Sequence, residues 1–122
     1  RAGLGQVVFS PLGQGVLTGK YTGGDRPSGS RGEDQERNRW MGAYLADVEK
    51  VDRLRPLADS LGLSMAQLAL AWCLREPCVS SVIVGVTRRA QLEDNCKAAG
   101  VEIPEEVAKS IDEIFPPPDP KP

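Results

Sequence analysis

The sequence predicts an α/β fold with a parallel sheet. Two short runs, at residues 6–10 and 81–86, combine apolar, β-branched and aromatic residues in the manner of strands. The segments between and after them carry apolar residues at helical spacing, and strands separated by helical crossovers run in the same direction. Two parallel strands leave unpaired edges, so the predicted sheet is incomplete by itself.

The first half of the chain contains one predicted strand, a loop and a helix. The strand at residues 6–10 is expected to be buried, and residues 11–32 after it are dense in Gly, Pro, Ser and Thr. Loops of that length are functional or disordered. Apolar residues on one face predict a helix over residues 44–61, kinked or restarted at Pro56 and ended by Gly62.

The second half opens on a helix that begins with a capping box. Ser64 and Gln67 have the spacing at which each side chain bonds the other residue's backbone N–H. The helix behind them is apolar almost all round and is predicted to be buried, and Pro77 ends it. Residues 81–86 then form a continuous apolar run, typical of a parallel strand covered on both faces.

Two further helices complete the predicted order. Thr87 is the expected N-cap of a helix that ends before Gly100. Pro104, at the first position of the last helix, predicts an amphipathic segment through Phe115. Residues 116–122 (PPPDPKP) are predicted to be a mobile Pro-rich tail.

Composition excludes several classes of partner. The 15 Lys and Arg are scattered among 17 Asp and Glu, and the net charge of −2 offers no basic face for nucleic acid. Apolar stretches are far shorter than the ~20 residues of a membrane span, so no membrane partner is expected. The chain starts at Arg1 without an initiator Met, which we interpret as an excised piece, a processed product or a recombinantly expressed segment.

The numbers of cysteine and histidine residues limit which catalytic and metal sites the chain can contain. Cys73, Cys78 and Cys96 have no CxxC spacing, which argues against a disulfide framework or a zinc site. We expect reduced, mostly buried thiols of a cytoplasmic protein. The absence of histidine excludes His-based nucleophile activation, acid–base catalysis and metal ligation within the chain, and no metal site is predicted.

The first candidate site is the segment FSPLGQGVLTGKY, which follows the first strand. It offers an aromatic ring, a hydroxyl, backbone N–H groups and a lysine to one small space. Gly13, Gly15 and Gly19 let the main chain approach a bulky anion closely. The alternative is a glycine-rich surface turn with a solvated lysine.

The second candidate site is the segment GVTRRAQLEDN, where a strand runs directly into a helix. Thr87 and Arg88 stand at the helix N-terminus, where free N–H groups and the macrodipole favour a phosphate. Gln91, Asp94 and Asn95 follow at helical spacing, within reach of one flat polar ligand. The alternative is an ordinary capped helix with a solvated polar face.

Together with the unit AQLALAWCLREPCVSSVIVGV, the two motifs resemble the C-terminal part of the aldo-keto reductase superfamily. The resemblance lies in the branch related to potassium-channel β subunits and bacterial general-stress reductases, and it covers residues 7–99. That family folds as a (β/α)8 TIM barrel. Residues 1–115 would then be the C-terminal part of such a barrel, with strand 7 at residues 7–10 and strand 8 at 81–85. Barrel enzymes bind phosphates with the loops after these two strands.

The resemblance implies NADPH as the cofactor and assigns its contacts residue by residue. The nicotinamide ring would stack on Phe9. The pyrophosphate and its ribose would be held by Ser10, Leu12, Gly13, Gln14 and Lys20, with Ser30 and Arg31 as a clamp. The 2′-phosphate, which selects NADPH over NADH, would be held by Gly85, Thr87, Arg88 and Gln91. The adenine would be contacted by Asp94, which replaces the Glu common there, and by Asn95.

The implied function of the full-length protein is the NADPH-dependent reduction of aldehydes or ketones to alcohols. The family's catalytic Tyr, Lys, Asp and His come from the N-terminal part of the barrel, and neither Tyr21 nor Tyr44 matches that Tyr. We therefore expect no catalytic residue here and an inactive isolated segment. Its partners would be the rest of the barrel and a small carbonyl substrate. The alternatives are a channel-β-like redox-sensing regulatory subunit and a non-catalytic fragment.

Overall fold

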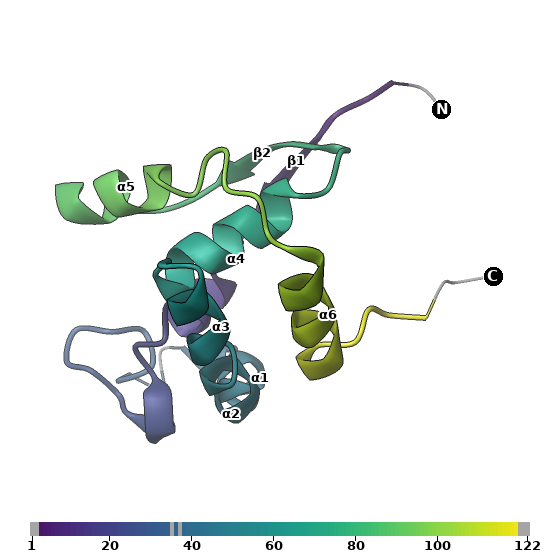
Figure 1. Ribbon diagram of the computed structural model, residues 1–122. Helices are drawn as coiled ribbons and strands as arrows, with labels where there is room; N and C mark the ends of the chain where they lie inside the picture. Colours follow the sequence, from purple (N-terminus) through teal and green to yellow (C-terminus); the bar gives the residue numbers. More distant parts are fainter. Residues whose placement is uncertain (1–2, 35, 37, 120–122) are drawn as a thin grey trace.

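The computed structural model of the 122-residue chain describes residues 3–34, 36 and 38–119. Two strands and a set of short helices are arranged as Figure 1 shows. In chain order they are β1 (Gln6–Phe9), the 3-10 helices η1 (Gly13–Thr18) and η2 (Thr22–Gly24), α1 (Met41–Leu45), α2 (Val48–Asp52), α3 (Arg55–Ser60), α4 (Met65–Leu74), β2 (Val79–Ile83), α5 (Arg89–Cys96) and α6 (Glu105–Ile114).

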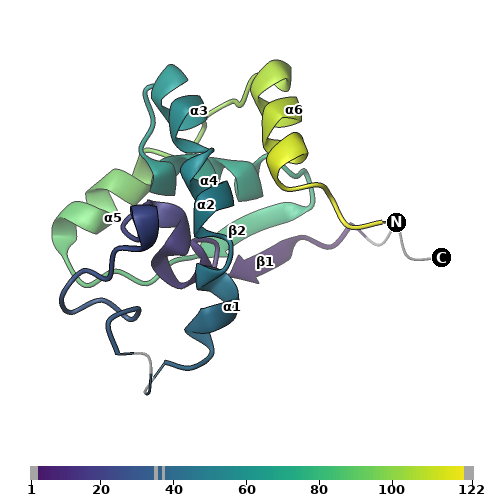
Figure 2. The same cartoon turned by 90° about the horizontal axis from the view of Figure 1, so that it is seen from below.

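The two strands pair side by side and in parallel, as the sequence predicts (Figure 1). Their register places Phe9 opposite Ile83, so both strands end at the same edge of the sheet. Helix α4 packs against β2, while α5 and α6 lie on opposite sides of α4 in both views (Figures 1 and 2). The loops that follow the two strands therefore start next to each other.

The prediction that both strands are buried is wrong for this chain. Val7 is 61% exposed, Phe9 77% and Ile83 59%. A parallel strand becomes buried only when it has neighbours on both edges and cover on both faces. In the described part of the chain each strand has one neighbour, and helix α4 supplies the cover on β2.

The single helix expected over residues 44–61 is instead three short helices, α1, α2 and α3. The apolar stripe survives the breaks, because Val48, Val51, Leu54 and Ala58 are all buried. Pro56 lies in the first turn of α3, where its missing N–H costs no helical hydrogen bond. The predicted restart at Pro56 is therefore confirmed. The break between α1 and α2 contains no proline, so the sequence gives no signal for it.

The capping box that opens α4 is confirmed. The backbone N–H of Gln67 donates to Ser64 Oγ at 3.1 Å, and the backbone N–H of Ser64 donates to Gln67 Oε1 at 3.0 Å. The prediction of an all-round buried helix holds only for part of it. Met65 and Leu68 are buried, whereas Trp72 is half-buried, with the guanidinium of Arg75 at 3.6 Å from its ring centroid.

The remaining helices differ slightly from their predicted bounds. Helix α5 begins at Arg89 with the extended Arg88 as its N-cap, so the prediction of Thr87 as N-cap is wrong. Helix α6 is amphipathic as expected, and Pro104 precedes its first residue instead of occupying it. The tail contains no regular structure over residues 116–119, and the rest of it lies outside the described residues.

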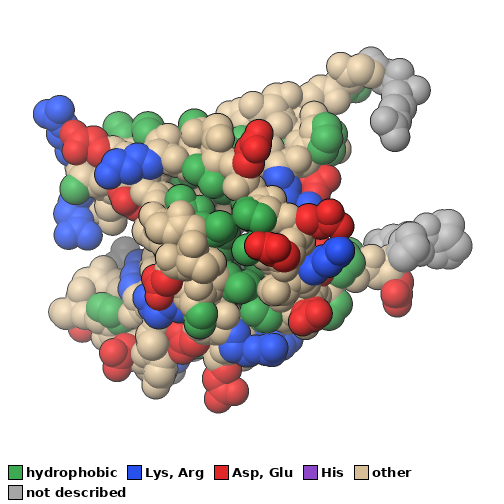
Figure 3. Space-filling model, viewed as in Figure 1, with side chains coloured by type: hydrophobic (Ala, Val, Ile, Leu, Met, Phe, Trp, Pro, Cys, Tyr) green, Lys and Arg blue, Asp and Glu red, His purple; other side chains and the backbone are tan. Residues whose placement is uncertain are grey.

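The core lies between α4, the short helices that precede it and α6. Its buried members are Val16, Tyr21, Met41, Val48, Val51, Leu54, Ala58, Met65, Leu68, Val107, Ile111 and Ile114. Hydrophobic side chains also remain visible in the middle of the face shown in Figure 3, surrounded by charged ones. The chain thus has its own core below the sheet, although the strands themselves stay exposed.

The cysteine prediction is only partly right. Cys73 on α4 is half-buried, and this burial raises the pKa of its thiol. Cys78 and Cys96 are exposed: Cys78 lies just before β2, and α5 has no buried residue. Among the described residues, no group of three His, Cys, Asp or Glu side chains could hold a metal ion.

No single helix in the described part of the chain is long and apolar enough to cross a membrane. By length and composition alone, the segments Val48–Ser60 and Met65–Leu74 pass that test as a pair, with a bend of 87° between them.

Tyr21 anchors the long loop that follows β1. Its side chain is 1% exposed, and its hydroxyl accepts the backbone N–H of Gly32 at 3.1 Å. A Cβ on Gly32 would lie 2.6 Å from Tyr21 Cε1, so only glycine allows this contact. The buried ring therefore ties the two ends of residues 21–32 together.

Removal of the Tyr21 hydroxyl should destabilise the protein. In Tyr21→Phe the N–H of Gly32 loses its acceptor while it stays buried, which costs about 1–3 kcal/mol of unfolding free energy. Urea unfolding of the full-length protein measures the loss. The matched control is Tyr44→Phe, because Tyr44 is 40% exposed, and its midpoint should not move. Equal midpoints for both variants would contradict the anchoring role.

Candidate functional site

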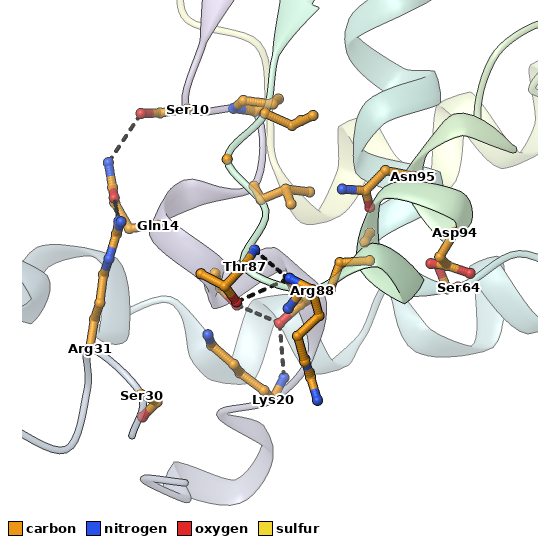
Figure 4. Close-up of a pocket in the computed structure, with 18 of the residues that line it drawn as sticks. Ser10, Gln14, Lys20, Ser30, Arg31, Ser64, Thr87, Arg88, Asp94 and Asn95 are labelled. Atoms are coloured by element: carbon orange, nitrogen blue, oxygen red, sulfur yellow. Dashed lines mark hydrogen bonds between the residues drawn. The ribbon is translucent and has the colours of Figure 1, made fainter. Parts of the chain in front are cut away.

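A pocket of about 720 Å³ opens at the edge where both strands end (Figure 4). It is lined by the loop after β1, the segment 29–31, the start of α4, and the strand-to-helix connection after β2. The lining residues are Phe9, Ser10, Pro11, Leu12, Gln14, Gly15, Thr18, Lys20, Gly29, Ser30, Arg31, Ser64, Ala66, Ile83, Val84, Gly85, Thr87, Arg88, Gln91, Asp94 and Asn95. Every cofactor residue predicted from the sequence is among them except Gly13.

The loop after β1 has an unusual backbone. Ser10 and Gln14 have φ of 54° and 59°, a region that side chains with a Cβ rarely adopt. Such strain persists where the surroundings hold it, commonly at ligand sites. Gly15 allows a further close approach, since a Cβ there would lie 2.9 Å from Lys20 Nζ. The loop is thus folded tightly back on its own lysine.

Gln14 links the two sides of this loop. Its amide donates to Ser10 Oγ at 3.1 Å, and its carbonyl oxygen accepts Nη1 of Arg31 (Figure 4). Next to Arg31, Ser30 Oγ is buried and has no hydrogen-bond partner among the residues that the structure describes. A buried hydroxyl in that state costs free energy unless a ligand or water satisfies it.

The start of α5 gathers three donors on one acceptor. The Oε1 of Gln91 accepts the N–H of Thr87 at 2.9 Å, the hydroxyl of Thr87 at 3.2 Å and the N–H of Arg88 at 3.2 Å (Figure 4). This oxygen marks the position at which the helix N-terminus binds an acceptor, where the macrodipole also favours negative charge.

Asp94 faces α4. Its Oδ2 accepts the hydroxyl of Ser64 at 2.9 Å, and its Oδ1 accepts the side-chain N–H of Gln67 at 2.9 Å. Gln67 also donates to the main-chain oxygen of Asp94 at 2.9 Å. The Asp94 carboxylate is therefore held by the capping residues of another helix, whereas the side chain of Asn95 has no hydrogen bond among the described residues.

The charges around the pocket favour an anion. Lys20, Arg31 and Arg88 contribute three cations from three separate segments. Asp94 is the one carboxylate among the described lining residues, and both its oxygens already accept hydrogen bonds. The arrangement suits a ligand with several phosphate oxygens.

Sequence reasoning missed the contribution of α4. Ser64 and Ala66 line the pocket, although the sequence identified Ser64 only as a helix cap. The capping box locates the start of α4, but it gives no signal that this start lies against a helix 30 residues further along the chain.

Parallel strands with cations in the loops at their carboxyl ends are the arrangement with which α/β barrel enzymes frequently bind phosphate. The chain belongs to the aldo/keto reductase family, whose model matches residues 1–115. This confirms the family that the sequence motifs resemble.

Individual relatives agree with this assignment. The chain is 48% identical over 101 residues to a probable voltage-gated potassium channel subunit beta of Arabidopsis thaliana, covering 81% of this chain and 31% of that protein. The corresponding protein of Oryza sativa subsp. japonica is 45% identical over 114 residues, 92% of this chain and 34% of the relative. An L-glyceraldehyde 3-phosphate reductase of Escherichia coli O157:H7 is 42% identical over 101 residues, which cover 79% of this chain and 29% of that protein. The chain spans about a third of the length of these relatives.

A double-mutant cycle tests the contact between α4 and α5. Gln67→Ala and Asp94→Ala should be coupled by about 1–2 kcal/mol of unfolding free energy, since the bond involves a charged acceptor. Urea unfolding of the full-length protein and its variants gives the four values. The control pair is Gln67→Ala with Glu93→Ala, because Glu93 pairs with Arg89 on the exposed side of α5. Equal coupling in both cycles would argue against the contact.

Proposed function

We propose that this chain is the cofactor-phosphate-binding part of a (β/α)8 reductase that uses NADPH to reduce small aldehydes or ketones in the cytoplasm. The observation that carries the proposal is the pocket itself. In a member of the aldo/keto reductase family, hydroxyl, amide and cationic groups from two strand-end loops meet in one place. Among the residues that the structure describes, no group of three His, Cys, Asp or Glu side chains could hold a metal ion, and the size of the pocket suits a small organic ligand.

Several features of the pocket fit a dinucleotide phosphate. The carbonyl of Gln91 stands where a phosphate oxygen would bind, since it accepts the helix N-terminal donors of Thr87 and Arg88. A 2′-phosphate at that place would displace the amide and gain the Arg88 guanidinium. The unpartnered hydroxyl of Ser30 would bond a pyrophosphate oxygen between Arg31 and Lys20.

The chain's own part in the reaction is to bind and orient. When bound, the nicotinamide cofactor supplies the hydride. Phe9, 77% exposed at the end of β1, offers a flat apolar face for the nicotinamide ring. The phosphate groups, held by the loop after β1 and by the start of α5, would fix how far the ring reaches along that face. The proton for the carbonyl oxygen would come from a Tyr in the remainder of the barrel.

A regulatory subunit that senses redox state is the second candidate. Two of the similar proteins carry the name of potassium channel β subunits, and their identity to this chain is at least as high as that of the reductase. Both functions use the same cofactor pocket. Steady-state turnover of aldehydes by the full-length protein separates them, because a sensing subunit needs the cofactor bound but not rapid turnover.

Cofactor selectivity should depend on Arg88. In the full-length protein, Arg88→Ala should weaken NADPH binding about ten- to a hundredfold, since a charge-assisted hydrogen bond contributes roughly 1.5–3 kcal/mol. NADH binding should barely change, and fluorescence titration measures both. Arg89→Ala is the control, because Arg89 is 89% exposed and paired with Glu93. Equal losses for the two cofactors in Arg88→Ala would show that Arg88 does not bind the 2′-phosphate.

The isolated segment should have no reductase activity. It contains no histidine, and its two tyrosines do not match the family's proton donor. NADPH consumption with a panel of aldehydes, measured on the purified segment and on the full-length protein, tests this. Turnover by the segment at the full-length rate would overturn the assignment of the catalytic groups to the rest of the protein.

A further inference from the structure

We propose that Asp52 and Arg55 are positioning residues for Lys20, holding the turn that presents its ammonium to the cofactor pyrophosphate. The inference rests on the proposed function, since it assigns Lys20 to the pyrophosphate. Neither Asp52 nor Arg55 lines the pocket. They belong to the end of α2 and the start of α3.

Asp52 holds the C-terminal side of the turn. Its Oδ1 accepts the hydroxyl of Thr22 at 2.8 Å, and its Oδ2 accepts the backbone N–H of Gly23 at 3.2 Å. Both carboxylate oxygens are thus engaged by adjacent residues about 30 positions earlier in the chain. Two bonds from one carboxylate fix the orientation of this backbone as well as its position.

Arg55 holds the N-terminal side. Its Nη2 donates to Thr22 Oγ1 at 2.9 Å and approaches the main-chain oxygen of Gly19 at 3.4 Å. A Cβ on Gly19 would lie 2.6 Å from this nitrogen, so the guanidinium packs directly on the glycine backbone. Gly19 also has a φ of 78°, a conformation that favours glycine.

Lys20 lies between these two attachment points. Its main chain is bounded by Gly19 and Thr22, and its ammonium is 5.3 Å from the centroid of the buried Tyr21 ring. Because the backbone on both sides of Lys20 is held, the lysine can adopt fewer conformations when no ligand is bound. A preorganised cation loses less conformational entropy on binding, which raises affinity without any contact from Asp52 or Arg55.

Two ligands separate positioning from general stability. NADPH carries both the pyrophosphate and the 2′-phosphate, whereas 2′-AMP carries only the adenosine and its 2′-phosphate. In the full-length protein, Asp52→Ala should weaken NADPH binding about three- to tenfold and leave 2′-AMP binding unchanged. Unchanged 2′-AMP binding also shows that the variant is folded. The matched control is Asp59→Ala, an exposed aspartate on the neighbouring α3, which should change neither.

Two further comparisons test the route through Lys20. Asp52→Ala should have no additional effect on NADPH binding in a Lys20→Ala background, because the cation that it positions is gone. Thr22→Ser should keep wild-type affinity, since it retains the hydroxyl between Asp52 and Arg55, whereas Thr22→Val should behave like Asp52→Ala.

The outcomes distinguish the two proposals. If wild-type protein binds neither NADPH nor 2′-AMP, the proposed function is wrong. If it binds both, and Asp52→Ala weakens both ligands equally, weakens neither, or adds to Lys20→Ala, then Asp52 does not position Lys20. Isothermal titration calorimetry provides all of these affinities.

Discussion

The parallel pairing of β1 with β2 is the constraint on which the site depends. Because Phe9 lies opposite Ile83, both strands end at one edge, and the loops after them share that edge. Lys20 and Arg88 are far apart in the sequence, yet they line the same pocket for this reason. An antiparallel pair would have placed the two loops at opposite edges and divided the cations between them.

The loop after β1 shows how a strained backbone is kept in place. Positive φ values at Ser10 and Gln14 are unfavourable by themselves, so other contacts must hold the loop. Two contacts with the rest of the chain hold it. The ring of Tyr21 is buried in the core, and the carboxylate of Asp52 accepts hydrogen bonds from Thr22 and Gly23 in the turn after Tyr21. The helices α1–α3 therefore support the loop after β1, and their apolar stripe packs against α4.

Local signals in the sequence predicted much of this, and tertiary contacts account for the rest. The capping box at Ser64 and the two strands are encoded within a few residues, and both predictions are confirmed, although β2 spans Val79–Ile83 instead of residues 81–86 and does not run directly into α5. The prediction that the strands are buried is wrong, because burial depends on neighbouring strands that the described part of this chain does not supply. The break between α1 and α2 was missed because no proline or glycine stands at it. The residues of the candidate site line one pocket, as predicted. The hydrogen bonds of Asp94 to α4 join residues about 30 positions apart, and no local sequence pattern predicts them.

Those bonds also explain how a carboxylate can lie in a pocket lined by the cations Lys20, Arg31 and Arg88. A free carboxylate there would repel phosphate, and the cost would grow as water is excluded. Ser64 donates to one oxygen of Asp94 and Gln67 to the other, and these donors stand at the N-terminus of α4, where the helix dipole favours negative charge. Gln91 is in the opposite situation: its carbonyl is neutral, and a phosphate oxygen competes for the same donors with a full charge. The two acceptors on α5, Asp94 and Gln91, thus have different roles. Asp94 fixes the helix to α4, and Gln91 accepts the hydrogen-bond donors at the helix N-terminus.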